Sequence, residues 1–265
     1  MLSEATAAYF PAEKPLSTGS RLRLLFASFP FWLALRFAVL LICKRIFSPE
    51  SSLNFSQTGE DAVIRSLLDE HQPGVYIDVG CHDPIKTSNT LSLYLHGWWG
   101  IAIDANESLM RRYRATRRRD IAVCAAVSDE EREMVFHEFD FELVNTLSDE
   151  VLDEWRSKWP ERRQRVVTTR RLDSILAEYL PPRTEISLLS VDVEGHDLNV
   201  LRSIDLNRYR PKLIVVEIHH FQLADAAQHP LTRYLAEAEF QLIGYDGLNG
   251  YFLDHHSRRS GLLPR

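Results

Sequence analysis

The sequence predicts a Rossmann-like α/β fold, in which a mostly parallel sheet is covered by helices on both faces. After Phe55, short apolar runs alternate with segments of helical periodicity, as they do when helices connect parallel strands. Several of the runs end in an acidic residue, at the edge where such sheets bind ligands. A chain of 265 residues can hold one such domain and an added segment.

The elements of this domain follow one another along 55–256. Five buried strands are expected, at 75–80, 100–105, 121–127, 186–193 and 212–218. Helices are expected between or after them, at 107–118, 149–159, 172–179, 197–204 and 231–238. Two more strand-like runs lie at 132–139 and 165–170. The last run, QLIGYDGLNGYFLDH, contains a Gly/Asn turn and predicts a C-terminal antiparallel hairpin, followed by a tail at 257–265.

An N-terminal extension, 1–54, precedes this domain and contains an apolar helical segment at 24–43 and a Pro/Ser linker at 48–52. The apolar segment has the length of a bilayer-spanning helix, but Arg36 interrupts it and basic residues flank both ends. A shallow helix lying in the membrane plane reconciles these features. The alternative is a pair of helices packed on the domain or on a second subunit. In the second case the protein would be a homo-oligomer.

Composition excludes several classes of protein. The net charge of −6 gives no reason to expect a nucleic-acid partner, and the arginine-rich run at 111–119 is interpreted as a solvated helix face. The three cysteines include no C-x-x-C pair, so neither a disulfide framework nor a cysteine zinc site is expected. This cysteine usage indicates a reducing compartment.

Acids at two consecutive strand ends indicate a nucleoside ligand. Asp78 and Gly80 end the first strand and Asp104 ends the second, where a carboxylate can accept both hydroxyls of a ribose. Gly80 lets the backbone approach the ligand. The glycine-rich fingerprint of a dinucleotide site is missing. The turn after the first strand, DVGCHDPIKTSNT, has one glycine and an added acid, Asp83. Two acids and few glycines favour S-adenosylmethionine, which carries a cationic amino group and no phosphate, over NAD.

The third strand ends in AAVSD, and its turn is the expected neighbour of the adenine. Ala126, Val127 and Ser128 are therefore candidates for backbone or hydroxyl contacts with that ring. A loop without a binding role explains these three residues equally well.

Seven sequence blocks occur together in a recognisable order. They are SQTGED (56–61), VYIDVGCHDP (75–84), SNT (88–90), GWWGIAIDAN (97–106), AAVSD (125–129), NTLS (145–148) and LLSVDVEGHDLNVLRSID (188–205). Together they resemble the FkbM-type S-adenosylmethionine-dependent methyltransferase family. The resemblance implies a class I methyltransferase fold and methyl transfer to a hydroxyl of a sugar, glycan or polyketide-like product. It also implies that Asp78 and Gly80 belong to the cofactor motif, Asp104 to the ribose contact, and Gln57 and Glu60 to the family's opening motif.

The ends of the fourth and fifth strands carry the residues suited to the chemistry. Methyl transfer to an alcohol oxygen needs a base, a metal ion that acidifies the hydroxyl, or both. Asp192, Glu194, Glu217 and His219 are the catalytic candidates, and Asp192 and Glu217 are also candidate ligands of Mg²⁺ or Mn²⁺. The alternative for Glu194 is a strand-to-helix turn, and each histidine alone is more often an ordinary loop residue.

The leading hypothesis is therefore an S-adenosylmethionine-dependent O-methyltransferase acting on a sugar, glycan or lipid-linked acceptor. A non-catalytic, membrane-anchored module of the same fold and an NAD-dependent oxidoreductase are the rivals. Because the cofactor is made in the cytoplasm, we expect a cytoplasmic protein associated with the inner face of the membrane through residues 24–43.

Overall fold

The structure is a computed structural model that describes residues 18–47, 53–69 and 72–256. The expected linker at 48–52 and the tail at 257–265 lie outside the described residues, as do residues 1–17 and 70–71.

A seven-stranded sheet forms the centre of the domain, with the strand order β3-β2-β1-β7-β8-β10-β9. From β3 to β8 the strands are parallel, and β10 is antiparallel to both β8 and β9. The predicted mostly parallel sheet with a C-terminal antiparallel hairpin is thus confirmed. The strands are β1 (Val75–Val79), β2 (Trp99–Asp104), β3 (Ile121–Cys124), β7 (Leu188–Val191), β8 (Leu213–Glu217), β9 (Phe240–Tyr245) and β10 (Asn249–Asp254).

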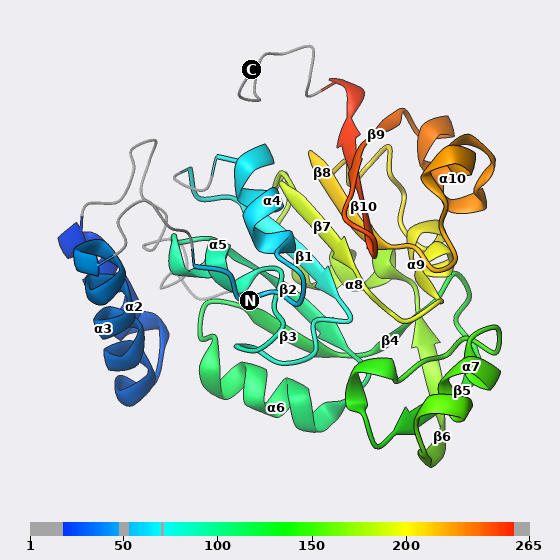
Figure 1. The fold of residues 1–265 in the computed structure, drawn as a ribbon, viewed down its shortest axis with the longest axis horizontal. Coiled ribbons are helices and arrows are strands. Elements are labelled where there is room, and N and C mark those ends of the chain that lie inside the picture. The colour runs from blue at the N-terminus through cyan, green and yellow to red at the C-terminus, as the bar shows by residue number, and fades with distance from the viewer. Residues whose placement is uncertain (1–17, 48–52, 70–71, 257–265) are drawn as a thin grey trace.

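Helices cover both faces of this sheet, because its buried strands carry apolar side chains on both sides (Figure 1). Ile77 and Ile214 point to one face, where they pack with α8 (Leu172–Tyr179), α9 (Asp197–Arg202) and α10 (Pro230–Glu237). Their neighbours Tyr76 and Leu213 point to the other face, which holds α4 (Glu60–Leu67) and α5 (Leu91–Leu95). Helix α6 (Glu107–Thr116) packs on this second face through Leu109, Met110 and Tyr113.

The expected strand at 121–127 is wrong in one respect, because it divides between two sheets. After β3, the amide of Ala125 donates to the carbonyl of Asp104, 3.0 Å away, and the chain then leaves β2. Residues Ala126–Val127 form β4, which pairs with β6 in a three-stranded sheet of order β4-β6-β5. The elements beyond it are β5 (Glu133–Phe139), η1 (Glu142–Val144), α7 (Leu152–Lys158) and β6 (Glu161–Arg170). A further short helix, η2 (Leu223–Gln228), follows β8.

The apolar segment at 24–43 is not one helix. It divides between α2 (Thr18–Ser28) and α3 (Phe31–Phe47), because Pro30 has no amide hydrogen to donate and disfavours a helical residue before it. One side of this helix pair packs on α5, where the rings of Phe29 and Tyr94 meet edge to face at 5.1 Å. None of the described helices is long and apolar enough to cross a membrane.

The arginine-rich run at 111–119 is only partly the solvated face that was expected. Arg117 follows the end of α6 and is completely buried. Its guanidinium donates to the hydroxyls of Ser88 and Thr90 and to the carbonyl of Pro84. The carboxylate of Asp120, 3.5 Å away, balances its charge. The run therefore contributes a buried polar network beneath β1 as well as exposed cations.

Candidate active site

A pocket opens at the carboxyl ends of β1, β2 and β7. The chain runs outward from β1 through β2 to β3 and then crosses back to β7, so the order of the strands reverses between β1 and β7. Ligands of open α/β sheets bind outside such a reversal. Strand-end residues line the pocket here, among them Val79, Gly80, Ile103, Asp104 and Asp192.

Gly80 lets the main chain turn at the edge of this pocket. Its φ of 78° is in the left-handed region, which residues with a Cβ atom disfavour. The amide of Gly80 donates to the carbonyl of Ile103, 2.9 Å away, and this bond fixes the turn against the end of β2.

Asp104 lies in the pocket wall, as the ribose assignment requires. Its carboxylate accepts hydrogen bonds from the amides of Asn106 at 2.7 Å and His82 at 3.1 Å, which hold it at the end of β2. Burial raises the pKa of Asp104, and these two hydrogen bonds oppose that rise. A partly buried, oriented carboxylate at this position suits a ligand that offers hydroxyl donors.

Three of the residues predicted for the cofactor lie behind the pocket wall. Asp78 is buried and accepts a hydrogen bond of 2.7 Å from Thr90, part of the network around Arg117. Glu60 is buried and accepts from the amide of Thr58 at 2.8 Å and the side chain of Asn249 at 3.2 Å. The hydroxyl of Ser128 lies 2.9 Å from Nε2 of His196. The other predicted cofactor residues, Gln57, Gly80, Asp104, Ala126 and Val127, line the pocket.

Sequence reasoning missed the part of the pocket that comes from the connection around η1. Phe136, Leu143 and Leu147 contribute apolar surface, and Asn145 and Thr146 contribute polar groups. The Thr146 hydroxyl donates to the carbonyl of Glu194, 2.7 Å away, and so ties this connection to the end of β7. The block NTLS (145–148) is part of the family resemblance, but the sequence alone assigned no function to its residues.

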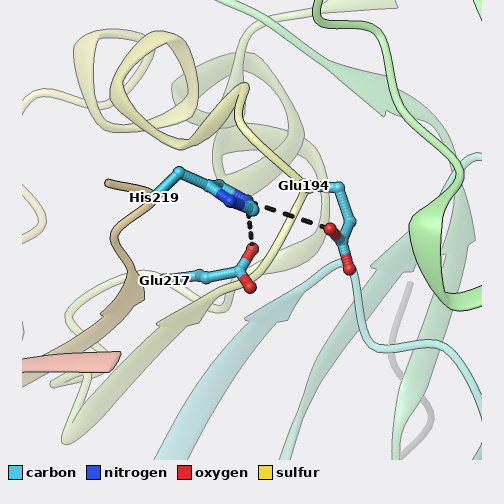
Figure 2. A group of neighbouring side chains, drawn as sticks. All are labelled: Glu194, Glu217 and His219. Atoms are coloured by element: carbon cyan, nitrogen blue, oxygen red, sulfur yellow. Dashed lines mark ion pairs between the residues drawn. The ribbon is translucent and has the colours of Figure 1, made fainter. Parts of the chain in front are cut away.

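The acids predicted at the ends of β7 and β8 come together. Asp192 and Glu194 line the pocket after β7, and Glu217 is the last residue of β8. Figure 2 shows the imidazole of His219 directed toward two carboxylates, 2.9 Å from Glu217 and 3.8 Å from Glu194. One ligand atom from each of these three residues lies within 4.8 Å of the others. Asp197 joins the group from the start of α9 by accepting from the amides of Val193 and Gly195.

Asp192, Glu194 and Asp197 hold protons more tightly than usual, because their pKa values are raised. Burial and the nearby Glu217 raise the pKa of Glu194 to about 9 and that of Asp197 to about 7. Burial raises the pKa of Asp192 well above its usual range, and the negative charges of Glu217 and Glu194 add to this rise. Burial alone would lower the pKa of His219, but Glu217 more than offsets it and the pKa rises. The cluster therefore favours any added positive charge.

Strained backbone conformations are found at the same place. His82, Thr87 and Glu194 have positive φ and line the pocket, and His220, beside His219, has a φ of 53°. Non-glycine residues in this region cost free energy, and they persist mainly where a functional site needs them. This backbone strain supports placing the functional site at the carboxyl ends of the strands.

Buried polar atoms near His219 lack aligned partners within the described part of the chain. They are Nε1 of Trp155, Oε2 of Glu217 and Nε2 of His219. The last two lie at ion-pair distance but not in hydrogen-bond alignment. The rings of Trp155 and His219 are 5.9 Å apart. Because an unpaired buried donor is costly, Nε1 of Trp155 indicates a polar group that binds here.

Three comparisons with known proteins gave different results. The model of the methyltransferase FkbM domain matches residues 78–242, which include the strand ends and the acidic cluster. No curated protein matches the chain. Among solved structures, the apo form of CalS11, a TDP-rhamnose 3′-O-methyltransferase of calicheamicin biosynthesis, matches with 14% identity and a TM-score of 0.37. That match covers 93% of this chain and 97% of the other.

Proposed function

The chain belongs to the methyltransferase FkbM family, and we propose that it methylates a hydroxyl of a sugar or glycan acceptor. As a member it is an S-adenosylmethionine-dependent methyltransferase, and its sheet is consistent with the class I fold. The NAD-dependent rival is thereby set aside. The observation that carries the finer proposal is the acidic cluster at the ends of β7 and β8, which can accept a proton from an acceptor hydroxyl.

The pocket fits S-adenosylmethionine in chemistry. Gly80 and Asp104 both line it, and the Asp104 carboxylate can accept from ribose hydroxyls. Ala126, Val127 and Leu147 give an apolar wall for the adenine. Asp192 and Glu194 lie in the wall near Gly80, and a ligand carrying an ammonium and a sulfonium would favour their ionised forms.

Bound S-adenosylmethionine supplies an electrophilic methyl group, and its transfer to oxygen requires the hydroxyl to lose a proton. Asp192 is proposed to accept that proton or to pass it to Glu217, which lies in the same cluster. To act as a base, Asp192 must be ionised. Burial and the neighbouring carboxylates oppose ionisation in the ligand-free protein, whereas the positive charge of bound S-adenosylmethionine would favour it. His219, when protonated, pairs with Glu217 and holds that carboxylate in place.

The acceptor is proposed to bind over β8, beside Trp155. The unpaired Nε1 of Trp155 can donate to an acceptor oxygen, while Oε2 of Glu217 can accept from an acceptor hydroxyl. An acceptor with several hydroxyl groups would satisfy these atoms together. This requirement supports a sugar or glycan over an acceptor with a single hydroxyl.

A divalent cation is a further part of the proposal. Glu194, Glu217 and His219 offer two carboxylates and one imidazole within reach of one ion, with Asp192 in the same cluster. This donor set suits Mg²⁺ or Mn²⁺, since no cysteine is among the ligands. Such an ion would relieve the repulsion among the carboxylates and acidify a bound hydroxyl.

The test is methyl transfer from tritiated S-adenosylmethionine into fractionated polysaccharide, lipid and small-molecule extracts from cytoplasm and membranes. We expect label in a carbohydrate-containing fraction, in an ether linkage that resists mild alkali. The Asp192→Asn variant is the matched control for background labelling. Label found only in protein, or in an alkali-labile ester, would contradict hydroxyl methylation while leaving family membership intact.

A further inference from the structure

The helix pair α2–α3 has two faces of different character. Ala34, Phe37 and Ala38 of α3 are buried against α5 and the preceding helix. Large apolar side chains stay exposed on another side of α3 and form what we call the apolar stripe. It consists of Phe31, Trp32, Leu35, Val39, Ile42 and Ile46.

The apolar stripe is continuous along the helix. Leu35, Val39, Ile42 and Ile46 follow one another at intervals of four, three and four residues, so they lie on one side of α3. The most exposed members are Trp32 at 74% and Ile46 at 66% of their surface, at opposite ends of α3. A contiguous exposed patch of this kind is rare on a soluble protein without a binding partner.

An aromatic group stands at the turn between the two helices. The ring of Phe31 lies 5.8 Å from that of Phe26 in α2 and 5.2 Å from that of Trp32. All three rings are exposed. Phe and Trp on the apolar face of a helix favour the boundary between lipid headgroups and acyl chains.

The charge of the segment selects among partners. Residues 18–47 contain Arg21, Arg23, Arg36, Lys44 and Arg45 and no Asp or Glu, although the whole chain carries a net charge of −6. The main chain of the exposed Arg118 bonds to the carbonyl of Ser28, which adds another cation beside the turn. A symmetric contact between two copies would set these cations against one another, whereas an anionic surface attracts them.

We propose that the apolar stripe docks the protein on an anionic lipid surface, with α3 lying in the membrane plane. This inference does not rest on the proposed acceptor or on methyl transfer. An in-plane position agrees with the finding that no described helix can cross a bilayer. The stripe then enters the headgroup boundary while Arg23 and Arg36, both exposed, meet lipid phosphates. A lipid-carried acceptor would be concentrated at the same surface.

Flotation of the full-length protein tests the proposal, with vesicles of phosphatidylcholine alone and with added phosphatidylglycerol. We expect flotation with the anionic vesicles, weakened at high salt because salt screens the cations. The double variant Leu35→Glu/Ile42→Glu should lower the vesicle-bound fraction at least about tenfold, since two charges would enter an apolar layer. The control Val166→Glu/Leu223→Glu alters two residues that are each 64% exposed elsewhere and should float like the wild type.

Melting temperature and S-adenosylhomocysteine affinity show that each variant is folded. A wild-type protein that does not float, or a stripe variant that floats as well as the wild type, overturns the proposal. Sedimentation measures the oligomeric state of the wild type and the stripe variant and can also contradict the proposal. If the wild type is a dimer that ignores vesicles and the stripe variant is a monomer, the stripe is a contact between copies.

Discussion

A Cβ atom built on Gly80 would lie 1.7 Å from the main-chain carbonyl oxygen of Asp192. The ends of β1 and β7 are therefore in direct backbone contact at the place where the strand order reverses. This contact sets the base of the pocket, because the two residues belong to the cofactor side and to the acidic cluster respectively. Any side chain at Gly80 must push these two groups apart.

We predict that Gly80→Ala disrupts both the fold and cofactor binding. The positive φ costs an L-residue about 1–2 kcal/mol, and the overlap with Asp192 adds about 1–3 kcal/mol. Gly247→Ala is the matched control, because Gly247 has a φ of 105° but nothing within 4 Å of an added Cβ. Calorimetry should show a lower melting temperature for both variants and lost S-adenosylhomocysteine binding for Gly80→Ala alone. Equal effects of the two changes would contradict the role given to the contact.

Asp104→Asn should weaken cofactor binding without unfolding the protein. An amide removes the negative charge and keeps one oxygen, which can accept from the amide of Asn106, while the bond from the amide of His82 is lost. Loss of charge-assisted bonds to ribose should cost about 1.5–3 kcal/mol, or roughly a 10- to 150-fold rise in Kd. The control is Asp153→Asn, an exposed acid of α7 that does not line the pocket. Calorimetric titration showing unchanged affinity for Asp104→Asn would remove the ribose assignment.

The strands of the sheet could be predicted from the sequence because each one is marked by a short apolar run of its own. Apolar runs such as 75–80 and 212–218 can form buried strands wherever they occur. The acids at their ends also follow from position, which is why Asp104, Asp192 and Glu217 were all brought to one edge.

Features that depend on distant partners could not be predicted in this way. Asp78 carries the same strand-end signal as Asp104, yet Thr90 and the buried Arg117 hold it behind the pocket wall. Nothing in the run 111–119 distinguishes Arg117 from its exposed neighbours. Likewise, the division of 121–127 into β3 and β4 depends on pairing with β6, far along the chain.

Asp192→Asn and Glu217→Gln should each lower turnover while leaving cofactor affinity nearly unchanged. Loss of a general base costs about a hundredfold or more in rate. Initial rates and S-adenosylhomocysteine titrations on the same preparations separate the two effects. Glu150→Gln, at an exposed acid that does not line the pocket, is the control. Wild-type turnover in both variants would place the base elsewhere.

Removal of divalent cations should lower turnover if Glu194, Glu217 and His219 hold an ion. We expect a chelator to inhibit the protein and Mg²⁺ or Mn²⁺ to restore activity, because the donors are mainly hard oxygens. Calorimetric titration of Mn²⁺ gives a readout independent of activity. His219→Ala should weaken that binding about tenfold or more by removing one ligand. Full activity in chelator, together with no heat of Mn²⁺ binding, would leave the acidic cluster as a base alone.

The last prediction concerns stability and pH in the ligand-free protein. Burial and Glu217 raise the pKa of Glu194 to about 9, whereas an exposed glutamate titrates at about 4.3. Between these values the folded protein binds one proton more than the unfolded chain, so the free energy of unfolding falls as pH rises. Glu194→Gln removes this loss, because glutamine has no proton to release.

Melting temperatures measured from pH 5 to pH 9 check this sign. The gain of the variant over the wild type should be smallest near pH 5 and grow toward pH 8, by up to about 1.4 kcal/mol per pH unit. For a domain of this size each kcal/mol corresponds to about 2–4 °C in melting temperature. Glu150→Gln, at an exposed acid, should keep the wild-type slope. A gain for Glu194→Gln that is largest at low pH would mean that the Glu194 carboxylate is stabilised by folding, opposite to the burial described here. Addition of Mn²⁺ should shrink the gain if the ion binds Glu194, because a cation favours the ionised form.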